Sequence, residues 1–492
     1  MYHRFGLANK CVVVILLLLL IGNNKICEAL VSVMAKLKGG IRLFRKRFLM
    51  LSLLLCGVIC FFWLKGQTFI QTDVKQEEAQ EKKRLLQMDE PHFWIISDNH
   101  FFPDTFIENS AVFRAFEATA LGNDLRYTET ILNAFVQKAL VEKPTGIIFT
   151  GDVTLNGEKA GLDRMVEILQ PLQEAGILIL AIPGNHDIYN GWAREFKNGD
   201  KITTHQISPQ DFQRGFSDGY RLSQATDKHS LSYSLDAGAY RLFLLDSNIY
   251  ADRFSKKEPV SHGRFSEETL AWLEAGLADA KEKGKTPVLF LHHNLLAHHE
   301  QMTDGFVLNN ASDVLSLVNQ YEVPLALSGH THLQNILQQV DPSNFYEISS
   351  GSFSAAGTSI GHLTLQENTI FYENESFDPL PYLDSQHLAN PDLKNYSAYV
   401  TLKAQKLGEE MARELFRSYA IDADTQLMKE VGEAYVFYFM GGSQLTPLEK
   451  EARLARLQES LPRKDDVSLL ESYRQLLDAA NWEAHHHLVI QP

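Results

Sequence analysis

The sequence predicts an α/β (α+β) catalytic domain that follows a membrane anchor and precedes a helical domain. Three observations support this prediction. Between residues 92 and 378, short apolar runs alternate with longer amphipathic runs, which is typical of buried strands separated by helices. A long uncharged run stands close to the N-terminus, and beyond residue 379 strand-like runs give way to helical spacing. The 492 residues are enough for two or three domains.

The predicted anchor is the 17-residue run Phe48–Leu64, which carries no charge and is just long enough to cross a bilayer. Six Lys and Arg residues precede it within residues 36–47, and the positive-inside rule keeps such a flank in the cytoplasm. No small-x-small cleavage pattern follows, which favours an uncleaved single-pass anchor. We therefore expect a protein of the cell membrane whose catalytic domain is extracytoplasmic. Met34 would begin a compact anchor by itself, so the role of residues 1–33 stays open.

Composition predicts the remaining boundaries and excludes one class of partner. Residues 1–70 contain the basic region and the anchor, residues 71–90 a charged stalk, residues 91–378 the catalytic domain and residues 379–492 the helical domain. Residues 71–492 carry 36 basic and 60 acidic residues, and a body this acidic argues against nucleic acid as a partner. All four cysteines lie within the first 60 residues, so the catalytic domain offers no thiolate to a metal.

Six apolar runs of the catalytic domain predict strands, and each run ends in a polar motif. The predicted strands are His92–Ser97, Gly146–Thr150, Ile177–Ile182, Arg241–Leu245, Pro287–Leu291 and Pro324–Leu327. Amphipathic runs predict helices at Tyr127–Val141 and Asp163–Ala175.

Four more helices are predicted in the C-terminal domain, near Leu393–Tyr419, Asp424–Met440, Pro447–Leu461 and Val467–Trp482. The third has a clear start, with Thr446 as N-cap and Glu449 closing a capping box. The three histidines His485–His487 are interpreted as solvated surface in preference to a metal site or a tag remnant.

Polar motifs at the strand ends supply a candidate set of metal ligands. The motifs are Ser97–His100, Gly151–Glu158, Gly184–Asp187, His292–Asn294 and Gly329–His332. Asp98 and His100 are two residues apart, as are His330 and His332, and in an extended segment such pairs point to one side. Each pair is therefore expected to face one centre. Glycines in front of Asp152, Asn185 and His330 are expected to make room at the strand ends.

The chemistry of these side chains predicts which metals bind and what they do. Carboxylate, imidazole and amide ligands without sulfur suit Mn, Fe or Zn. Seven candidate ligands suit two ions that share one carboxylate: Asp98, His100, Asp152, Asn185, His292, His330 and His332. His293 is an alternative to His292 for the fourth motif. Two ions with a bridging hydroxide form a site for in-line attack on phosphorus.

The five motifs, in this order, resemble the calcineurin-like metallophosphoesterases, and the resemblance extends from Asp98 to His332. It implies a four-layer αββα sandwich of two sheets flanked by helices. It also implies one ion held by Asp98, His100, Asp152 and His332, and a second held by Asp152, Asn185, His292 and His330. By the same resemblance, His186 contacts substrate, either stabilising the transition state or protonating the leaving group. Asp187 is expected either to orient His186 or to cap the turn.

The absence of arginine from two motifs separates branches of this superfamily. The protein serine/threonine phosphatases carry arginines there that clamp a phosphomonoester dianion, whereas Gly151–Gly157 and Gly184–Asp187 contain none. The motifs are more similar to those of the class III cyclic-nucleotide phosphodiesterases. We therefore predict a phosphodiesterase that acts on cyclic nucleotides or related small substrates. The alternatives are a broad nucleotidase or phosphomonoesterase, and a membrane-tethered binding scaffold with a vestigial site.

Overall fold

The computed structural model describes residue 76 and residues 78–492, except 121, 301, 340, 342, 343, 422, 423, 444, 462–466 and 479–481. The predicted anchor Phe48–Leu64 and its basic flank lie outside the described residues. Within the described part, none of the helices combines the length and the apolar character needed to cross a bilayer. Residues 78–492 form one compact unit.

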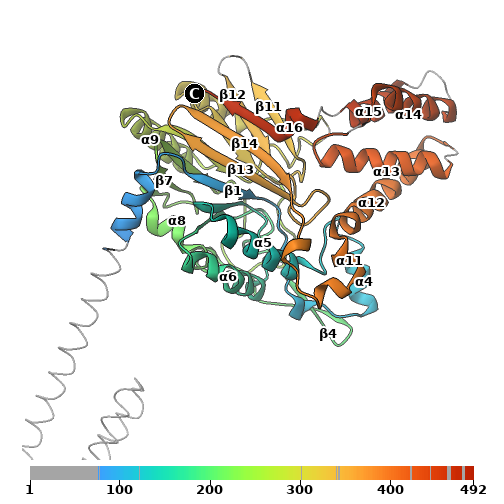
Figure 1. The fold of residues 1–492 in the computed structure, drawn as a ribbon, viewed down its shortest axis with the longest axis horizontal. Helices are drawn as coiled ribbons and strands as arrows, with labels where there is room; N and C mark the ends of the chain where they lie inside the picture. Colours follow the sequence, from blue (N-terminus) through green and yellow to red (C-terminus); the bar gives the residue numbers. More distant parts are fainter. Residues whose placement is uncertain are drawn as a thin grey trace, which may run out of the picture. The chain divides into compact units, whose positions relative to one another are not determined.

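Two β-sheets form the core of this unit (Figure 1). The first sheet contains, in order, β15 (His487–Ile490), β14 (Thr369–Ser376), β13 (Ser359–Gln366), β1 (His92–Ile96), β2 (Gly146–Thr150) and β3 (Leu178–Ile182). The second contains β11 (Asn335–Gln339), β12 (Phe345–Ser349), β10 (Leu325–Ser328), β9 (Thr286–Leu291), β8 (Tyr240–Leu245), β7 (Tyr233–Ala237) and β6 (Ala225–Thr226). A separate hairpin pairs β4 (Arg194–Lys197) with β5 (Asp200–Thr203).

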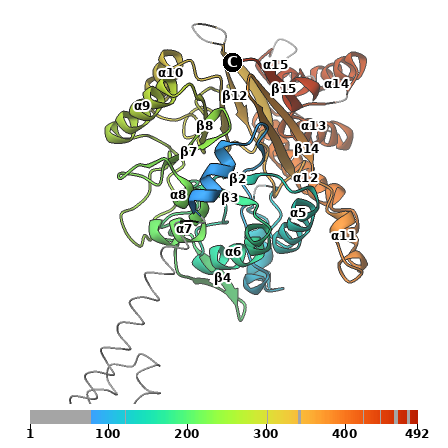
Figure 2. The same ribbon diagram turned by 60° about the vertical axis from the view of Figure 1, so that its left-hand side comes forward.

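The sheets pack face to face through apolar side chains of both, such as Ile148 and Leu180 against Leu244 and Phe290. The outer face of the first sheet is covered by α5 (Thr128–Glu142) and α6 (Lys159–Glu174). The outer face of the second is covered by α9 (Glu267–Glu282) and α10 (Ala311–Gln320). Figure 2 shows these two helix pairs on opposite sides of the sheets. The predicted four-layer sandwich is therefore confirmed.

Shorter helices connect the main elements of the sandwich. They are η1 (Asp104–Phe106), α4 (Ala111–Glu117), α7 (Pro209–Gly215), α8 (Ser217–Leu222), η2 (Leu380–Tyr382) and η3 (His387–Ala389).

All six predicted strands are present, with ends within one residue of the predicted bounds. Within the first sheet β1, β2 and β3 run parallel, and within the second β8, β9 and β10 do. Strands covered on both faces read as continuous apolar runs, which is why the sequence marked them so clearly. The carboxyl ends of parallel neighbours lie at one edge of their sheet, so each parallel set brings its motifs together.

The C-terminal segment is helical as predicted. It contains α11 (Pro391–Lys394), α12 (Tyr396–Ser418), α13 (Thr425–Phe439), α14 (Pro447–Ser460), α15 (Val467–Asp478) and α16 (Trp482–His486). The capping box at Thr446 is formed, because its side chain accepts from the Glu449 N–H and the Glu449 carboxylate accepts from the Thr446 N–H.

The prediction that strands end before residue 379 is wrong. β15 pairs antiparallel with β14, where Ile490 lies opposite Ile370, so the chain returns to the catalytic sheet after the helices. Four residues that begin with the last of three histidines are too short a signal by themselves, and the free edge of β14 supplies the missing partner. The proposed domain boundary at residue 379 stays a prediction.

Part of the charged segment that is predicted as a stalk packs on the body of the protein. Residues 78–86 are helical, and Leu85 of this helix is buried against the body of the protein. Glu81 forms a 2.6 Å ion pair with Arg221, and the Lys82 ammonium donates to the Ser223 carbonyl. This part of the segment packs on the sandwich because its charges find partners there, so it is not a free spacer.

Candidate metal centre

Six of the seven predicted ligands come together in two groups at the strand ends. The first group is Asp98, His100 and His332, and the second is Asp152, His292 and His330. In each group, one ligand atom of every residue lies within 4.8 Å of the others. The two groups are drawn from loops after β1, β2, β9 and β10.

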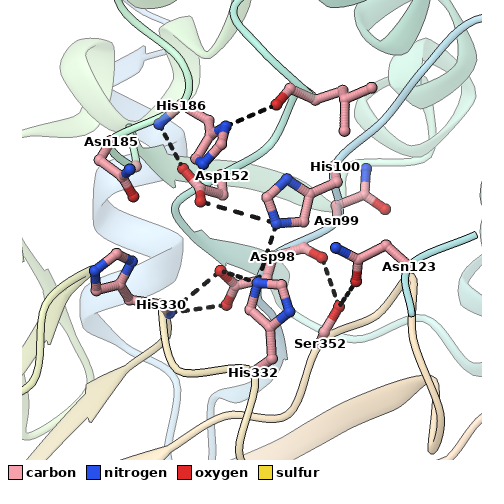
Figure 3. Close-up of polar contacts among 12 residues, drawn as sticks. Asp98, Asn99, His100, Asn123, Asp152, Asn185, His186, His330, His332 and Ser352 are labelled. Atoms are coloured by element: carbon pink, nitrogen blue, oxygen red, sulfur yellow. Dashed lines mark hydrogen bonds and ion pairs between the residues drawn. The ribbon is translucent and has the colours of Figure 1, made fainter. Parts of the chain in front are cut away.

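The Asp152 carboxylate of the second group also contacts the first, and Figure 3 shows its contact with His100. Its Oδ2 is 3.9 Å from His100 Nε2 of the first group and 3.5 Å from His292 Nε2 of the second. Its Oδ1 accepts a hydrogen bond from the backbone N–H of His186 at 2.8 Å. One buried carboxylate therefore reaches both groups, as a shared ligand of two ions must.

The first group is compact, with Asp98 and His100 buried and His332 partly exposed. The Nε2 atoms of His100 and His332 are 3.1 Å apart, and His332 Nε2 is 3.4 Å from Asp98 Oδ1. Burial lowers the pKa of His100 to about 3, so its imidazole is neutral and its lone pair is free for a metal. The Nδ1 atom of His100 is buried without a hydrogen-bond partner in the described structure. This donor set fits a cation.

Backbone carbonyls orient the histidines of the second group. His292 donates from Nδ1 to the Thr150 carbonyl at 3.0 Å, which leaves Nε2 free towards Asp152. His330 donates from Nε2 to the carbonyls of Ser261 and Gly305, at 3.0 and 2.8 Å, so its free nitrogen is Nδ1. Burial by itself would lower the pKa of His292, but the carboxylates of Asp152 and Asp98 outweigh this effect and raise the pKa to about 9. The centre therefore attracts positive charge.

Asn185 joins the second group through its amide, because its Oδ1 lies 3.1 Å from His292 Nε2. The alternative fourth-motif ligand, His293, is engaged elsewhere. Its ring contacts the Ser247 hydroxyl at 2.8 Å and the Ser261 carbonyl at 3.0 Å. Of the two neighbouring histidines, the structure brings His292 into the ligand group.

The prediction that the ligand pairs are extended is wrong. Five ligand residues have positive φ: Asp98 (49°), His100 (43°), Asp152 (48°), His330 (70°) and His332 (57°). His330 and His332 also face different groups and not one. Asp and His tolerate the left-handed region better than most residues, but each such residue still costs about 1–3 kcal/mol. Five strained ligands in one place mark a functional site.

The glycines at the strand ends make room for the ligands, as predicted. A Cβ atom at Gly184 would lie 2.2 Å from Asp152 Oδ1, and one at Gly151 would lie 2.4 Å from His292 Nδ1. A Cβ at Gly329 would lie 2.0 Å from the Ser97 hydroxyl and 2.7 Å from Asp98 Oδ2. Any larger residue would displace a ligand or its support.

His186 lies beside the two groups and belongs to neither. Its Nδ1 is 3.0 Å from both the Leu155 carbonyl and Asn156 Oδ1, so Nδ1 carries the hydrogen and Nε2 is left free. The His186 ring stands edge-on to that of His100, with 5.3 Å between centroids. The His186 side chain is half-buried.

The structure favours the turn-capping alternative for Asp187. Its carboxylate accepts from the backbone N–H groups of Gly184, Val153 and Thr154 and from the Thr154 hydroxyl. Among the described contacts, none joins it to the His186 ring. The predicted catalytic role of Asp187 is therefore not supported, and it holds the two glycine-containing loops together.

Sequence reasoning missed the residues that do orient His186. Asn156 contacts its ring, and the buried Glu158 accepts from the Asn156 N–H at 2.8 Å. Burial raises the pKa of Glu158 to about 7. Both residues stand in the Gly151–Glu158 motif. Their place close to the ligand Asp152 is the sequence signal that could have identified them.

Comparisons with known proteins agree with this geometry. Residues 91–334 match the family of calcineurin-like phosphoesterases. The chain is 26% identical over 195 residues to glycerophosphodiester phosphodiesterase GpdQ of Enterobacter lignolyticus, covering 39% of this chain and 58% of that protein. It is 34% identical over 94 residues to the 3′,5′-cyclic adenosine monophosphate phosphodiesterase CpdA of Escherichia coli, covering 19% and 30%.

The match to each of these relatives spans less than two thirds of the relative's length. Among solved structures, a dimetal phosphatase from Danio rerio matches with 16% identity and a TM-score of 0.43, covering 58% of this chain and 96% of that one. With the family match over residues 91–334 and the two ligand groups that share Asp152, the chain belongs to the calcineurin-like metallophosphoesterases.

Proposed function

We propose that the protein is a metal-dependent phosphodiesterase that acts on cyclic nucleotides or related small phosphodiesters. The observation that carries the proposal is the Asp152 carboxylate between two ligand groups. When bound, two ions of Mn, Fe or Zn would lower the pKa of a shared water and neutralise charge on the phosphoryl group. The names of the distant relatives GpdQ and CpdA, both phosphodiesterases, support the diester class.

The charges around the centre also support a diester. The loops Gly151–Gly157 and Gly184–Asp187, which supply Asp152 and Asn185 to the centre, contain no arginine. A phosphomonoester carries one more negative charge than a diester and gains more from a bidentate guanidinium. The site is therefore suited to the less charged substrate.

His186 is assigned the proton transfer to the leaving oxygen. Leu155 and Asn156 hold its Nδ1–H, so the proton that is transferred is a second one, carried on Nε2 of the doubly protonated ring, and its loss to the leaving oxygen returns the neutral imidazole. Exposed Trp192 stands near this ring, with 6.5 Å between the ring centroids.

The proposal is tested with purified full-length protein that is stripped of metal and reloaded with Mn²⁺. The substrates are 3′,5′-cyclic AMP, bis(p-nitrophenyl) phosphate and p-nitrophenyl phosphate. We expect kcat/KM for the two diesters to exceed that for the monoester by about ten-fold or more. A faster monoester would favour the nucleotidase or phosphomonoesterase alternative, and failure to bind stoichiometric metal would favour the scaffold.

Replacing His186 tests its role in the same assays. General acid catalysis is worth roughly 10²–10⁴-fold and matters most for a poor leaving group such as a ribose alkoxide. His186→Ala should therefore lose about that factor on the cyclic nucleotide and keep much of the activity on bis(p-nitrophenyl) phosphate, with metal content unchanged. His387→Ala in η3, a histidine that belongs to neither ligand group, is the control. Equal losses on both diesters would assign His186 to charge stabilisation instead.

A further inference from the structure

The loop that carries His330 and His332 has a structural support outside the catalytic motifs. Gln334 follows His332 by two residues and is 1% exposed. Its backbone N–H donates to the carbonyl of Phe439 at 3.0 Å, and its Nε2 donates to the carbonyl of His485 at 2.7 Å. One side chain and its own backbone thus contact two separate parts of the C-terminal helical segment.

Gln334 is also tied to the catalytic sandwich. Its Oε1 accepts from the backbone N–H of Gly351 at 3.2 Å and lies 3.5 Å from the Tyr372 hydroxyl. A Cβ at Gly441, just beyond α13, would lie 2.7 Å from the Gln334 carbonyl oxygen, so the chain there passes in close contact. The Nε2 atom, the Oε1 atom and the backbone N–H of Gln334 therefore each form a hydrogen bond with a different segment of the chain.

His485 makes a second contact with the same stretch. Its Nδ1 accepts a hydrogen bond from the backbone N–H of Ile336 at 2.9 Å. Because its carbonyl binds Gln334 and its ring binds Ile336, His485 fixes both sides of residue 335. The histidine run that the sequence suggested as solvated surface thus has a member with a defined structural role.

The loop needs this support because its own bonding is sparse. His330 and His332 both have positive φ, and the backbone N–H of His330 donates only to the Asp98 carboxylate. Thr331 supplies the remaining internal contacts, because its N–H donates to the Gly329 carbonyl and its hydroxyl accepts from the Leu333 N–H. A strained loop of this kind persists only where its surroundings hold it.

The helical segment holds a second loop beside the first ligand group. The hydroxyls of Tyr396 and Tyr399 on α12 donate to the buried carboxylate of Asp124. Next to Asp124, the Asn123 amide oxygen lies within 3.5 Å of the Ser352 hydroxyl, which donates to the Asp98 carbonyl at 2.9 Å (Figure 3). Helices far along the chain thus reach the surroundings of Asp98 as well as those of His332.

We infer that Gln334 is a positioning residue through which the C-terminal helical segment, residues 391–490, sets the geometry of the ligand loop carrying His330 and His332. This inference rests on the proposed function only in taking the two ligand groups as metal sites. The segment is then a part of the metal centre's framework, and a change in its packing alters metal affinity without touching a ligand.

The test measures metal binding and not turnover. Full-length Gln334→Ala is compared with wild type by equilibrium dialysis against Mn²⁺, with bound metal counted per chain. Loss of an outer partner of metal ligands typically weakens binding about 10–100-fold, and we expect this for at least one of two ions. Gln338→Ala, an exposed glutamine on β11, is the matched control and should bind as wild type does.

A second pair of variants keeps the test decisive if Gln334→Ala does not fold. His485→Ala removes the acceptor for the Ile336 N–H and should weaken metal binding in the same direction. In His485→Asn the amide oxygen can take the place of Nδ1, so binding should recover. Circular dichroism and the melting temperature of the metal-free proteins show whether each variant is folded.

The outcomes separate this inference from the proposed function. A wild-type protein that binds no stoichiometric metal would overturn both. If wild type binds two ions and folded Gln334→Ala and His485→Ala bind them within about three-fold of its affinity, the proposed function stands and this inference fails. Weak binding that His485→Asn does not recover would show a general loss of packing and would also overturn it.

Discussion

The Asp152 carboxylate contacts both ligand groups through one oxygen atom, Oδ2. Asp152→Asn removes the charge from a side chain whose Oδ2 faces both His100 and His292. We expect loss of most activity and of at least one ion per chain, because the amide lacks the negative charge that two cations at this position would share. Asp163→Asn, which removes a surface ion pair with Lys159 on α6, is the control for the same chemical change. Two retained ions and near-normal turnover would place the bridge elsewhere.

Gly184 gives a residue-scale test of how little space the centre leaves. A methyl group there would meet Asp152 Oδ1 and N at 2.2 Å, and Gly184 has no positive φ, so the clash is purely steric. Gly184→Ala should therefore lower both metal content and melting temperature. In Gly161→Ala on α6 the nearest atoms are at 3.6 Å, and a helical Ala is favoured over Gly by about 1 kcal/mol. This control should be neutral or stabilising, and equal behaviour of the two variants would contradict the steric argument.

The sequence was informative about which residues meet and less informative about how their backbone does so. His292 could be preferred to His293 because it directly follows the strand, and the structure brings it to Asp152. The left-handed backbone at His330 and His332 could not be foreseen, because periodicity describes extended or helical segments only. The role of Asp187 was ambiguous, because an Asp that caps a turn and an Asp that orients a neighbouring histidine occur in the same sequence pattern.

The contact between α12 and Asp124 is open to test at the scale of the element. Tyr396 is buried, and its hydroxyl donates to Asp124 Oδ2 at 3.1 Å. Tyr396→Phe should lower the free energy of unfolding by about 1–3 kcal/mol, because it leaves a buried carboxylate short of a donor. Tyr435→Phe on α13, whose hydroxyl has no hydrogen bond among the described contacts, is the control. A urea melt of each variant measures the difference, and a loss in Tyr435→Phe as large as in Tyr396→Phe would argue against a specific bond.

The elements that could be predicted from the sequence are strands that are buried on both faces along their whole length. The runs of β2 and β3 are buried at every position between two packed layers and are mostly apolar, so their bounds were clear from sequence. β15 was missed because its four residues alternate between buried and exposed and gain stability only from β14. The helix at residues 78–86 was read as stalk because its many charges conceal that Leu85 is buried and that Glu81 has a partner.

At the scale of the whole molecule, we propose that the body of the protein is extracytoplasmic. The basic run that precedes Phe48–Leu64 motivates this orientation. Protease added to intact cells should digest or release the body, whereas a cytosolic marker in the same cells should survive. Protection of the body until the cells are lysed would reverse the proposed orientation.

The pairing of β15 with β14 has a consequence for how the protein is made. Between the end of β14 at Ser376 and the start of β15 at His487, the chain forms the whole helical segment. At roughly 5–20 residues per second, a ribosome needs about 5–20 seconds to synthesise this stretch. During that time β14 exposes an unpaired edge, which is a template for wrong strand pairing and aggregation. Nascent chains should therefore be most dependent on chaperones, and most sensitive to growth temperature, in the interval after β14 emerges and before β15 pairs with it.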